Sequence, residues 1–182
     1  MKLRICGGKY KRTQISIPDA LSGFRPTKNI VREAVCNILQ DRINNADVLE
    51  LCAGSCLFSM EMISRGAAKA VAVERNKDLC AFVKKQIAAA DYQWKDKLNV
   101  LCEDVAVFAE RTAQKFDIIY FDPPYYEDEL SALAIKLSAM CKDDGGVVVF
   151  EFASGDRFVE KHYADYGLRR YGKSSVLFIE KE

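Results

Sequence analysis

The chain has 182 residues, of which 49% are apolar and 29% are charged, and its formal net charge is +1. This length is typical of one domain, and ten Gly with four Pro are too few for a collagen-like or disordered chain. No apolar run reaches the ~20 residues of a membrane span, and the N-terminus lacks the apolar stretch of a secretory signal. We therefore expect a cytoplasmic protein that does not enter a membrane.

The cysteines and the single histidine limit which metal sites, disulfides and catalytic triads the chain can form. Seven Cys occur without any C-x-x-C pair, so we expect reduced thiols instead of disulfides or a zinc site. His162 is the only histidine, which argues against a Ser-His-Asp triad and rules out a two-histidine metal site. We expect no metal.

The positive charge is concentrated in the N-terminal part of the chain. Residues 1–32 hold eight Lys and Arg and one acidic residue, Asp19, whereas the rest of the chain has an excess of acidic residues. A basic segment on an acidic body favours contact with a polyanion, most simply the phosphate backbone of a nucleic acid. The alternative is a solvated surface without a partner.

The predicted elements divide the chain into a basic β-hairpin arm, residues 1–27, and a larger domain, residues 28–182. Residues 2–17 alternate loosely around Gly7-Gly8, which predicts the hairpin, and residues 28–41 have the apolar spacing of a helix. Strands are then predicted at 48–52, 70–74, 98–102, 117–121, 147–152, 168–171 and 175–179, and helices at 57–65, 77–90, 105–113 and 130–141. This alternation predicts an α/β fold, with a seven-stranded, mainly parallel sheet covered by helices on both faces.

Ligands of such sheets bind beyond the carboxyl ends of the strands. The first strand ends at Glu50 and leads into the small-residue turn Ala53-Gly54-Ser55. One glycine without a following Gly-Lys-Ser/Thr argues against NAD and ATP, but it suits a nucleoside without phosphates, such as S-adenosylmethionine. Glu74 follows Gly54 by 20 residues, the spacing of a ribose-binding acid, and Asp104 after the third strand could accept from an adenine amino group. For either acid, a solvated carboxylate is the alternative.

The most specific motif is Asp122-Pro123-Pro124-Tyr125, after the fourth predicted strand. Two prolines stiffen the loop and supply no N–H donors, so the Asp122 carboxylate and the Pro123 carbonyl could both accept from one exocyclic amine. Tyr125 offers a face on which a nucleobase can stack. Two aimed acceptors favour attack by such an amine on an electrophilic methyl group. The alternative is a rigid turn that ends a strand.

In order and spacing, these motifs resemble the class I S-adenosylmethionine-dependent methyltransferases, and the Asp-Pro-Pro-Tyr motif resembles those that modify amino nitrogens of nucleobases. A closer resemblance, to the RsmD family of 16S ribosomal RNA guanine-N2 methyltransferases, covers nearly the whole chain. It is carried by residues 4–12, by Arg25-Pro26-Thr27 with residues 31–34, by residues 52–55 with 64–67, and by residues 122–125. The chain departs from the family at Cys56 and Ser59, where the family usually has glycine. At Cys56 a side chain could crowd the methionine part of the cofactor, or the backbone could need an angle that glycine adopts more readily.

The resemblance implies a Rossmann-like class I fold, S-adenosylmethionine as cofactor, and ribosomal RNA or an assembling small ribosomal subunit as partner. It implies a catalytic set of Asp122, Pro123 and Tyr125. The implied cofactor-binding set is Glu50, Ala53, Gly54, Ser55, Glu74, Asp104 and Asp122. The implied RNA-binding set is Lys9, Lys11, Arg12, Arg25, Thr27, Pro124 and Tyr125.

Two other functions stay open from the sequence. Asp-Pro-Pro-Tyr also suits an adenine-N6 methyltransferase, although we expect no separate target-recognition domain in a chain of this length. A non-catalytic RNA-binding relative is the second alternative, since the first loop lacks two of the family's glycines. We expect a monomer in either case.

Overall fold

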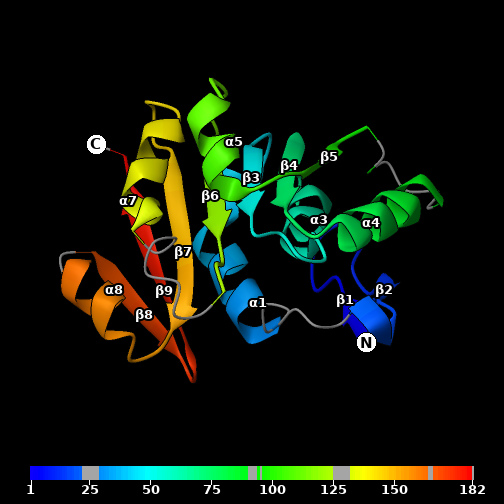
Figure 1. Ribbon diagram of the computed structural model, residues 1–182, viewed down its shortest axis with the longest axis horizontal. Coiled ribbons are helices and arrows are strands. Elements are labelled where there is room, and N and C mark those ends of the chain that lie inside the picture. The colour runs from blue at the N-terminus through cyan, green and yellow to red at the C-terminus, as the bar shows by residue number, and fades with distance from the viewer. Residues whose placement is uncertain (22–28, 90–93, 95, 125–131, 164–165, 182) are drawn as a thin grey trace.

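The computed structural model describes residues 1–21, 29–89, 94, 96–124, 132–163 and 166–181 (Figure 1). Its main feature is a seven-stranded sheet in the order β5-β4-β3-β6-β7-β9-β8. The strands are β3 (Asp47–Leu51), β4 (Lys69–Glu74), β5 (Leu98–Cys102), β6 (Ile118–Phe121), β7 (Val147–Ala153), β8 (Gly167–Tyr171) and β9 (Ser174–Glu180). The first five are parallel, and β9 pairs antiparallel with both β7 and β8. The predicted α/β fold is confirmed.

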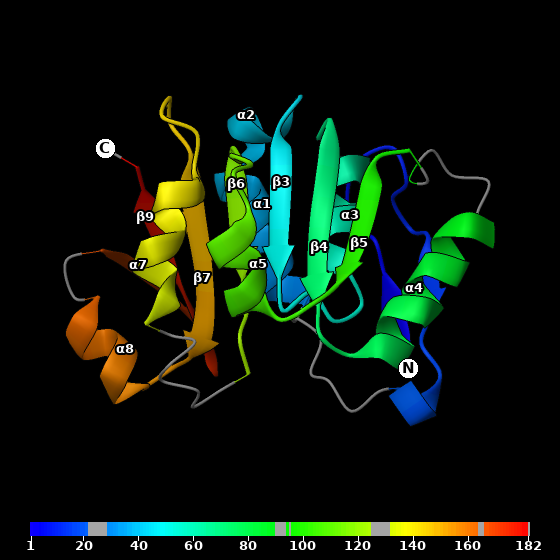
Figure 2. The same ribbon diagram turned by 45° about the horizontal axis from the view of Figure 1, so that its top comes forward.

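Helices cover both faces of the sheet, as Figure 2 shows. One layer packs on the side chains of Val48, Ala72 and Tyr120 and contains α1 (Asn29–Ile38), α3 (Leu57–Ser64) and α4 (Lys77–Ala89). The opposite layer packs on Leu49, Phe121 and Phe150 and contains α5 (Val105–Arg111), α7 (Leu133–Leu137) and α8 (Arg157–His162). The two clusters follow from the alternation of side chains along each buried strand.

The N-terminal hairpin pairs β1 (Lys2–Arg4) with β2 (Gln14–Ser16) in a separate two-stranded sheet, followed by the short turn η1 (Asp19–Leu21). Its apolar side chains Ile5 and Ile17 are buried in the same cluster as α1 and α3. The predicted hairpin is therefore present, and it packs against the larger domain.

Two helix predictions needed correction, and one helix was not predicted. The predicted helix over 28–41 is two helices, because α1 ends at Ile38 and α2 (Gln40–Ile43) begins after the buried Leu39. The predicted helix over 130–141 is α7 followed by the 3-10 turn η2 (Ser138–Met140), and residues 130–131 lie outside the described part. Helix α8 was not predicted, since six residues are too few to show a periodicity; the Asp156 carboxylate caps it by accepting from the Val159 N–H at 3.1 Å. Within the described residues, no helix has both the length and the apolar character to span a membrane.

Candidate active site

A cavity of about 640 Å³ lies beyond the carboxyl ends of the parallel strands. Its walls come from the segments that follow β3, β4, β5 and β6, from the end of β7 and from the η1 turn. The chain proceeds from β3 to β4 and β5 on one side and to β6 and β7 on the other (Figure 2). The lining residues therefore place the cavity at the switch point of the sheet. Open α/β sheets bind their ligands at this point, and the volume is in the range of small-molecule sites.

The turn between β3 and α3 has three residues with positive φ. They are Cys52 (φ 56°), Gly54 (φ 51°) and Cys56 (φ 57°). Cys56 is fully buried and is the N-cap residue of α3. A left-handed conformation is costly for any residue with a Cβ, and glycine adopts it freely. The departure from the family's glycine at Cys56 therefore falls where the backbone favours glycine, which is one of the two possibilities raised from the sequence.

The second departure, Ser59, has a defined contact with Glu50. The Ser59 N–H and hydroxyl both donate to Oε2 of Glu50, at 2.8 and 2.5 Å. A glycine could supply only the first of these bonds. Burial raises the pKa of Glu50 to about 7, although the bonds from Ser59 oppose that rise. The first predicted acid of the site is thus a buried carboxylate that titrates near neutral pH.

The second predicted acid, Glu74, joins two loops. One carboxylate oxygen accepts from the Gly54 N–H and the other from the Asn76 N–H, both at 2.8 Å. The third, Asp104, is the N-cap of α5 and accepts from the Ala106 N–H at 2.8 Å. All three acids line the cavity together with the Ala53-Gly54-Ser55 turn. The structure brings the predicted cofactor-binding residues together.

The wall beyond β6 contains Asp122, Pro123 and Pro124. Pro123 is buried and Pro124 is exposed, so the loop places one proline inside and one at the rim. Asp122 is half-buried. Tyr125, the fourth residue of the motif, lies outside the described residues.

Glu151 of β7 also lines this wall, and it was not predicted from the sequence. Its side chain is buried, and its Oε2 accepts from the Tyr120 hydroxyl at 2.5 Å. The signal was available in the sequence: an acid near the carboxyl end of the otherwise apolar strand Val147–Ala153. A buried acid in such a strand needs a polar partner or a function.

The predicted RNA-binding residues of the arm do not line the cavity. Lys9, Lys11 and Arg12 are exposed in the connection between β1 and β2. That connection is held at the C-terminal end of α3, where the Lys9 N–H donates to the Ser64 carbonyl at 2.7 Å. The cavity lies at the N-terminal end of this helix, about 12 Å away along eight residues. Arg25 and Thr27 lie outside the described residues.

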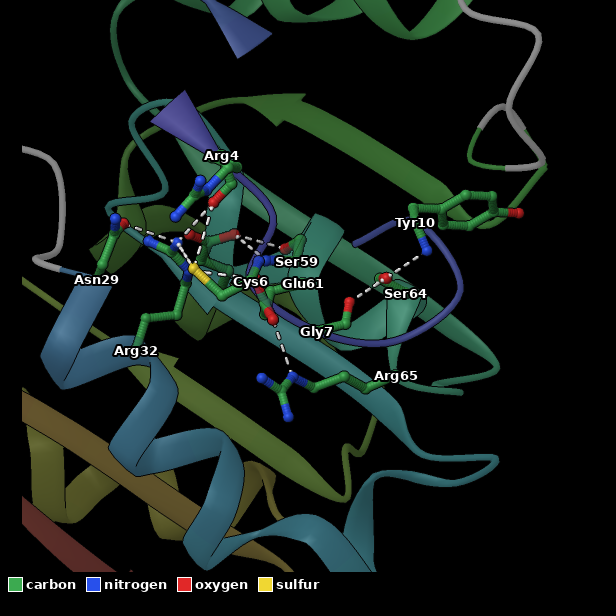
Figure 3. Close-up of polar contacts among 11 residues, drawn as sticks. Arg4, Cys6, Gly7, Tyr10, Asn29, Arg32, Ser59, Glu61, Ser64 and Arg65 are labelled. Carbon is green, nitrogen blue, oxygen red and sulfur yellow. Dashed lines mark hydrogen bonds and ion pairs between the residues drawn. The ribbon is translucent and has the colours of Figure 1, made fainter. Parts of the chain in front are cut away.

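A buried polar cluster holds the hairpin in place, as Figure 3 shows. Glu61 of α3 accepts from the Cys6 N–H at 2.8 Å and from the Arg65 guanidinium at 2.9 Å, and it pairs with Arg32 of α1 at 3.4 Å. The Arg32 guanidinium also donates to the Arg4 carbonyl at 2.8 Å. The basic turn is thus fixed relative to the cavity through α1 and α3.

The close packing of the hairpin requires glycine at Gly8, and a side chain at Gly7 would displace the end of the Arg65 side chain. A Cβ on Gly7 would lie 2.4 Å from the Arg65 guanidinium, and one on Gly8 would lie 1.9 Å from the Ser64 carbonyl oxygen. Gly8 also has a φ of 74°. The Gly7-Gly8 pair that marked the hairpin in the sequence therefore marks its contact with α3.

Comparisons with known proteins agree with this fold. The chain is 29% identical over 124 residues to "Ribosomal RNA small subunit methyltransferase D" of Escherichia coli, a match that covers 68% of this chain and 61% of that protein. It is 27% identical over 187 residues to "Putative rRNA methyltransferase YlbH" of Bacillus subtilis, covering 98% and 99% of the two chains. The solved structure of "Putative methyltransferase yhhF from Escherichia coli" matches with a TM-score of 0.80 at 24% identity, over 100% of this chain and 99% of that one.

The match to the E. coli ribosomal RNA methyltransferase thus spans less than two thirds of that protein's length. The family model matches nearly the whole chain, residues 3–180. The chain therefore belongs to the family described as Conserved hypothetical protein 95, the RsmD family of S-adenosylmethionine-dependent methyltransferases.

Proposed function

We propose that the protein transfers a methyl group from S-adenosylmethionine to the exocyclic N2 amine of a guanine in small-subunit ribosomal RNA. One observation carries this proposal: a single cavity joins the Gly54–Glu74 loops to the Asp122-Pro123 wall across the switch point of the sheet. A cofactor on the first side and a base on the second would meet in that cavity. The names of the relatives support ribosomal RNA as the substrate.

The charge of the cavity fits this cofactor. Among the described lining residues six are acidic and one, Arg75, is basic; the acids are Glu50, Glu74, Asp78, Asp104, Asp122 and Glu151. Such a lining disfavours the phosphates of ATP or NAD and favours a cationic ligand. S-adenosylmethionine is cationic at its sulfonium and carries no phosphate. The donor set therefore suits a methyl donor better than a dinucleotide.

Each cofactor-side residue has a proposed role. Glu74, held by two backbone N–H groups, accepts from the ribose hydroxyls, and Asp104 accepts from the adenine amino group. The Ala53-Gly54-Ser55 turn lines the methionine part, and Glu50 supplies negative charge beside it. When bound, the cofactor supplies an electrophilic methyl group on sulfur.

The base-side residues orient the nucleophile. The Asp122 carboxylate and the Pro123 carbonyl accept from the guanine N2 amine and turn its lone pair toward the methyl carbon. The amine nitrogen held by these two acceptors would take the methyl group as the methyl–sulfur bond breaks, and it would then release one proton to an acceptor in the cavity or to water. Tyr125 stacks on the guanine, and Pro124 borders it. The base reaches this place only after leaving its helical stack or from an unpaired position.

The exposed arm residues Lys9, Lys11 and Arg12 bind RNA phosphates at a distance from the target base, and Arg25 and Thr27 are proposed as further RNA contacts. A structured RNA extends far enough to reach both the arm and the cavity. The cytoplasm, where the seven thiols stay reduced, is the compartment proposed for this reaction.

The test is methyl transfer from labelled S-adenosylmethionine to unmethylated small-subunit RNA or particles, followed by mass spectrometry of the digested nucleosides. The proposal expects N2-methylguanosine. Detection of N6-methyladenosine would support the adenine alternative, and RNA binding without any transfer would support a non-catalytic relative.

Two variants check the assignment of the motif. Asp122→Asn should lower transfer at least ~100-fold, with a much smaller loss of cofactor affinity, because the other cofactor-binding residues are unchanged. Asp143→Asn, which changes an exposed acid in an ion pair with Lys181, is the matched control and should keep the wild-type rate.

A further inference from the structure

Glu151 is a buried acid that the roles above leave unexplained. Its side chain is 2% exposed, and the residue lines the same cavity as Asp122. Burying a carboxylate is costly, and its hydrogen bond from Tyr120 offsets part of that cost. A leucine at the same place would avoid the cost entirely. The position of this acid therefore calls for a function in the cavity.

The sheet register places Glu151 beside the methyl-transfer motif. Strands β6 and β7 pair with Tyr120 opposite Val149 and Phe121 opposite Phe150. The next residues along the chain are Asp122, directly after the end of β6, and Glu151, whose side chain lies on the same side of the sheet as Tyr120. Both line the cavity. Neighbouring strands are about 4.8 Å apart, so two groups on a planar base could meet these two carboxylates at once.

The Glu151 carboxylate is held in one orientation. The Tyr120 hydroxyl donates to its Oε2, and the Tyr120 ring stacks on Phe58 with a centroid distance of 3.9 Å and an interplanar angle of 15°. Phe58 and Tyr120 are both at most 1% exposed. A carboxylate fixed by such a rigid pair suits recognition, because little freedom is lost when a ligand binds.

The chemistry of a carboxylate distinguishes guanine from adenine. An ionised carboxylate only accepts hydrogen bonds, and its two oxygens offer about four acceptor positions. Guanine has an N–H donor at ring position N1 next to its N2 amine. Adenine has an unprotonated N1 next to its N6 amine, and that lone pair would face the carboxylate. Flipped bases are read along this edge.

We propose that Glu151 accepts the ring N1–H of the target guanine while Asp122 holds the adjacent N2 amine, and so determines the choice of base. This inference rests on the proposed function, because it names a further contact at that reaction's substrate. Tyr120 acts as a positioning residue for the carboxylate. Adenine and other bases without an N1–H are excluded because two acceptors would be brought together without a proton between them.

The test compares guanine with an analogue that lacks both the N1–H and the oxygen at C6; the Glu151 variant then isolates the contribution of N1. The methylated position is first mapped, and small-subunit RNA is then ligated with either guanine or 2-aminopurine at that position. The analogue keeps the N2 amine but has an unprotonated N1. For the wild-type protein, kcat/KM should favour guanine by about 100-fold or more. For Glu151→Gln, the ratio should fall to within about 10-fold, because an amide can accept or donate after a flip of its plane.

The controls separate a recognition role from a structural one. Glu180→Gln, an exposed change on the neighbouring strand β9, should keep the wild-type ratio. Tyr120→Phe should lower the ratio less than Glu151→Gln does. If Glu151→Gln slows both substrates by the same factor, the inference is overturned.

The wild-type protein alone also tests the inference, should the variant not fold. Equal rates on the two RNAs would overturn the role of Glu151 and leave the proposed function intact. Failure to methylate the guanine RNA at all would instead overturn the proposed function.

Discussion

The guanidinium of Arg32 lies 3.4 Å from the carboxylate of Glu61, and neither side chain has any solvent exposure (Figure 3). The pair joins α1 to α3, and both partners also bond to the backbone of the N-terminal hairpin, through Cys6 and Arg4. The N-terminal hairpin, predicted as a basic arm, is therefore anchored to the core by the buried charges of Arg32 and Glu61. Its exposed lysines keep a fixed position relative to the cavity.

Removal of the Glu61 charge should destabilise the protein strongly. Glu61→Gln leaves the Arg32 guanidinium buried without its counterion, a loss that typically costs about 3–5 kcal/mol. Urea unfolding of the wild type and the variant measures the difference. Glu180→Gln breaks the exposed pair with Arg42 and should cost less than about 1 kcal/mol. Similar losses for the two variants would contradict a buried pair.

In most positions an alanine variant is more stable than a glycine variant. The left-handed backbone at Cys56 predicts the opposite order there. Both replacements remove the thiol, but only glycine removes the Cβ that is unfavourable at φ 57°. Cys56→Gly should therefore be more stable than Cys56→Ala by about 1 kcal/mol.

Cys80 provides the matched control for Cys56, because it is also buried but lies within α4. There Cys80→Ala should be more stable than Cys80→Gly by about 1 kcal/mol. Urea unfolding of the four variants tests this reversal. The same order of Ala and Gly at both positions would refute it.

Much of the fold could be predicted from the sequence, because strands and long helices leave local patterns of apolar residues. Buried parallel strands appear as short apolar runs, so all seven strands of the main sheet were found. The 20-residue spacing marked Glu74 as a ribose-binding acid, and the structure adds that its carboxylate accepts from the Gly54 N–H. Helix α8 and the break after α1 were missed, because short helices and interruptions leave no periodicity to detect.

The contacts between distant segments could not be predicted from local patterns. The hydrogen bond between Ser59 and Glu50 joins residues nine apart in the sequence. The hydrogen bonds between Tyr120 and Glu151 and between Cys6 and Glu61 join residues 31 and 55 apart. Each of these hydrogen bonds forms only because the fold brings two separate elements together. The sequence indicated Ser59 only as a missing glycine, whereas its hydroxyl is a partner of a buried acid.

Glu74 should control cofactor affinity through both of its oxygens. In Glu74→Gln one oxygen becomes an NH2 group that faces the N–H of Gly54 or Asn76, so the loops lose a bond and the ribose loses an acceptor. We expect S-adenosylmethionine affinity to fall at least ~10-fold, as measured by calorimetry without RNA. Glu103→Gln is the control, because Glu103 pairs with Arg111 and does not line the cavity. An equal effect of the two changes would argue against this role of Glu74.

The buried carboxylate of Glu50 predicts how stability varies with pH. Its pKa is raised from 4.5 to about 7 by burial, so between these values the folded protein keeps a proton that the unfolded chain releases. The stabilisation from this group is fully present below about pH 4.5 and is lost as the pH rises through 7. The shift corresponds to about 3 kcal/mol over that window. Glu50→Gln, which stays neutral, should lack this part of the pH dependence.

The measurement is urea unfolding of the wild type and Glu50→Gln at several pH values from 4.5 to 8. The difference in unfolding free energy between the two proteins removes the contribution of all other titrating groups that the change leaves alone. As the pH rises, the wild type should lose about 3 kcal/mol of unfolding free energy relative to Glu50→Gln. The proposed cationic cofactor favours the ionised carboxylate, so a saturating amount should move the midpoint of this shift below pH 7. A difference that stays constant with pH would show that Glu50 is already ionised in the folded protein.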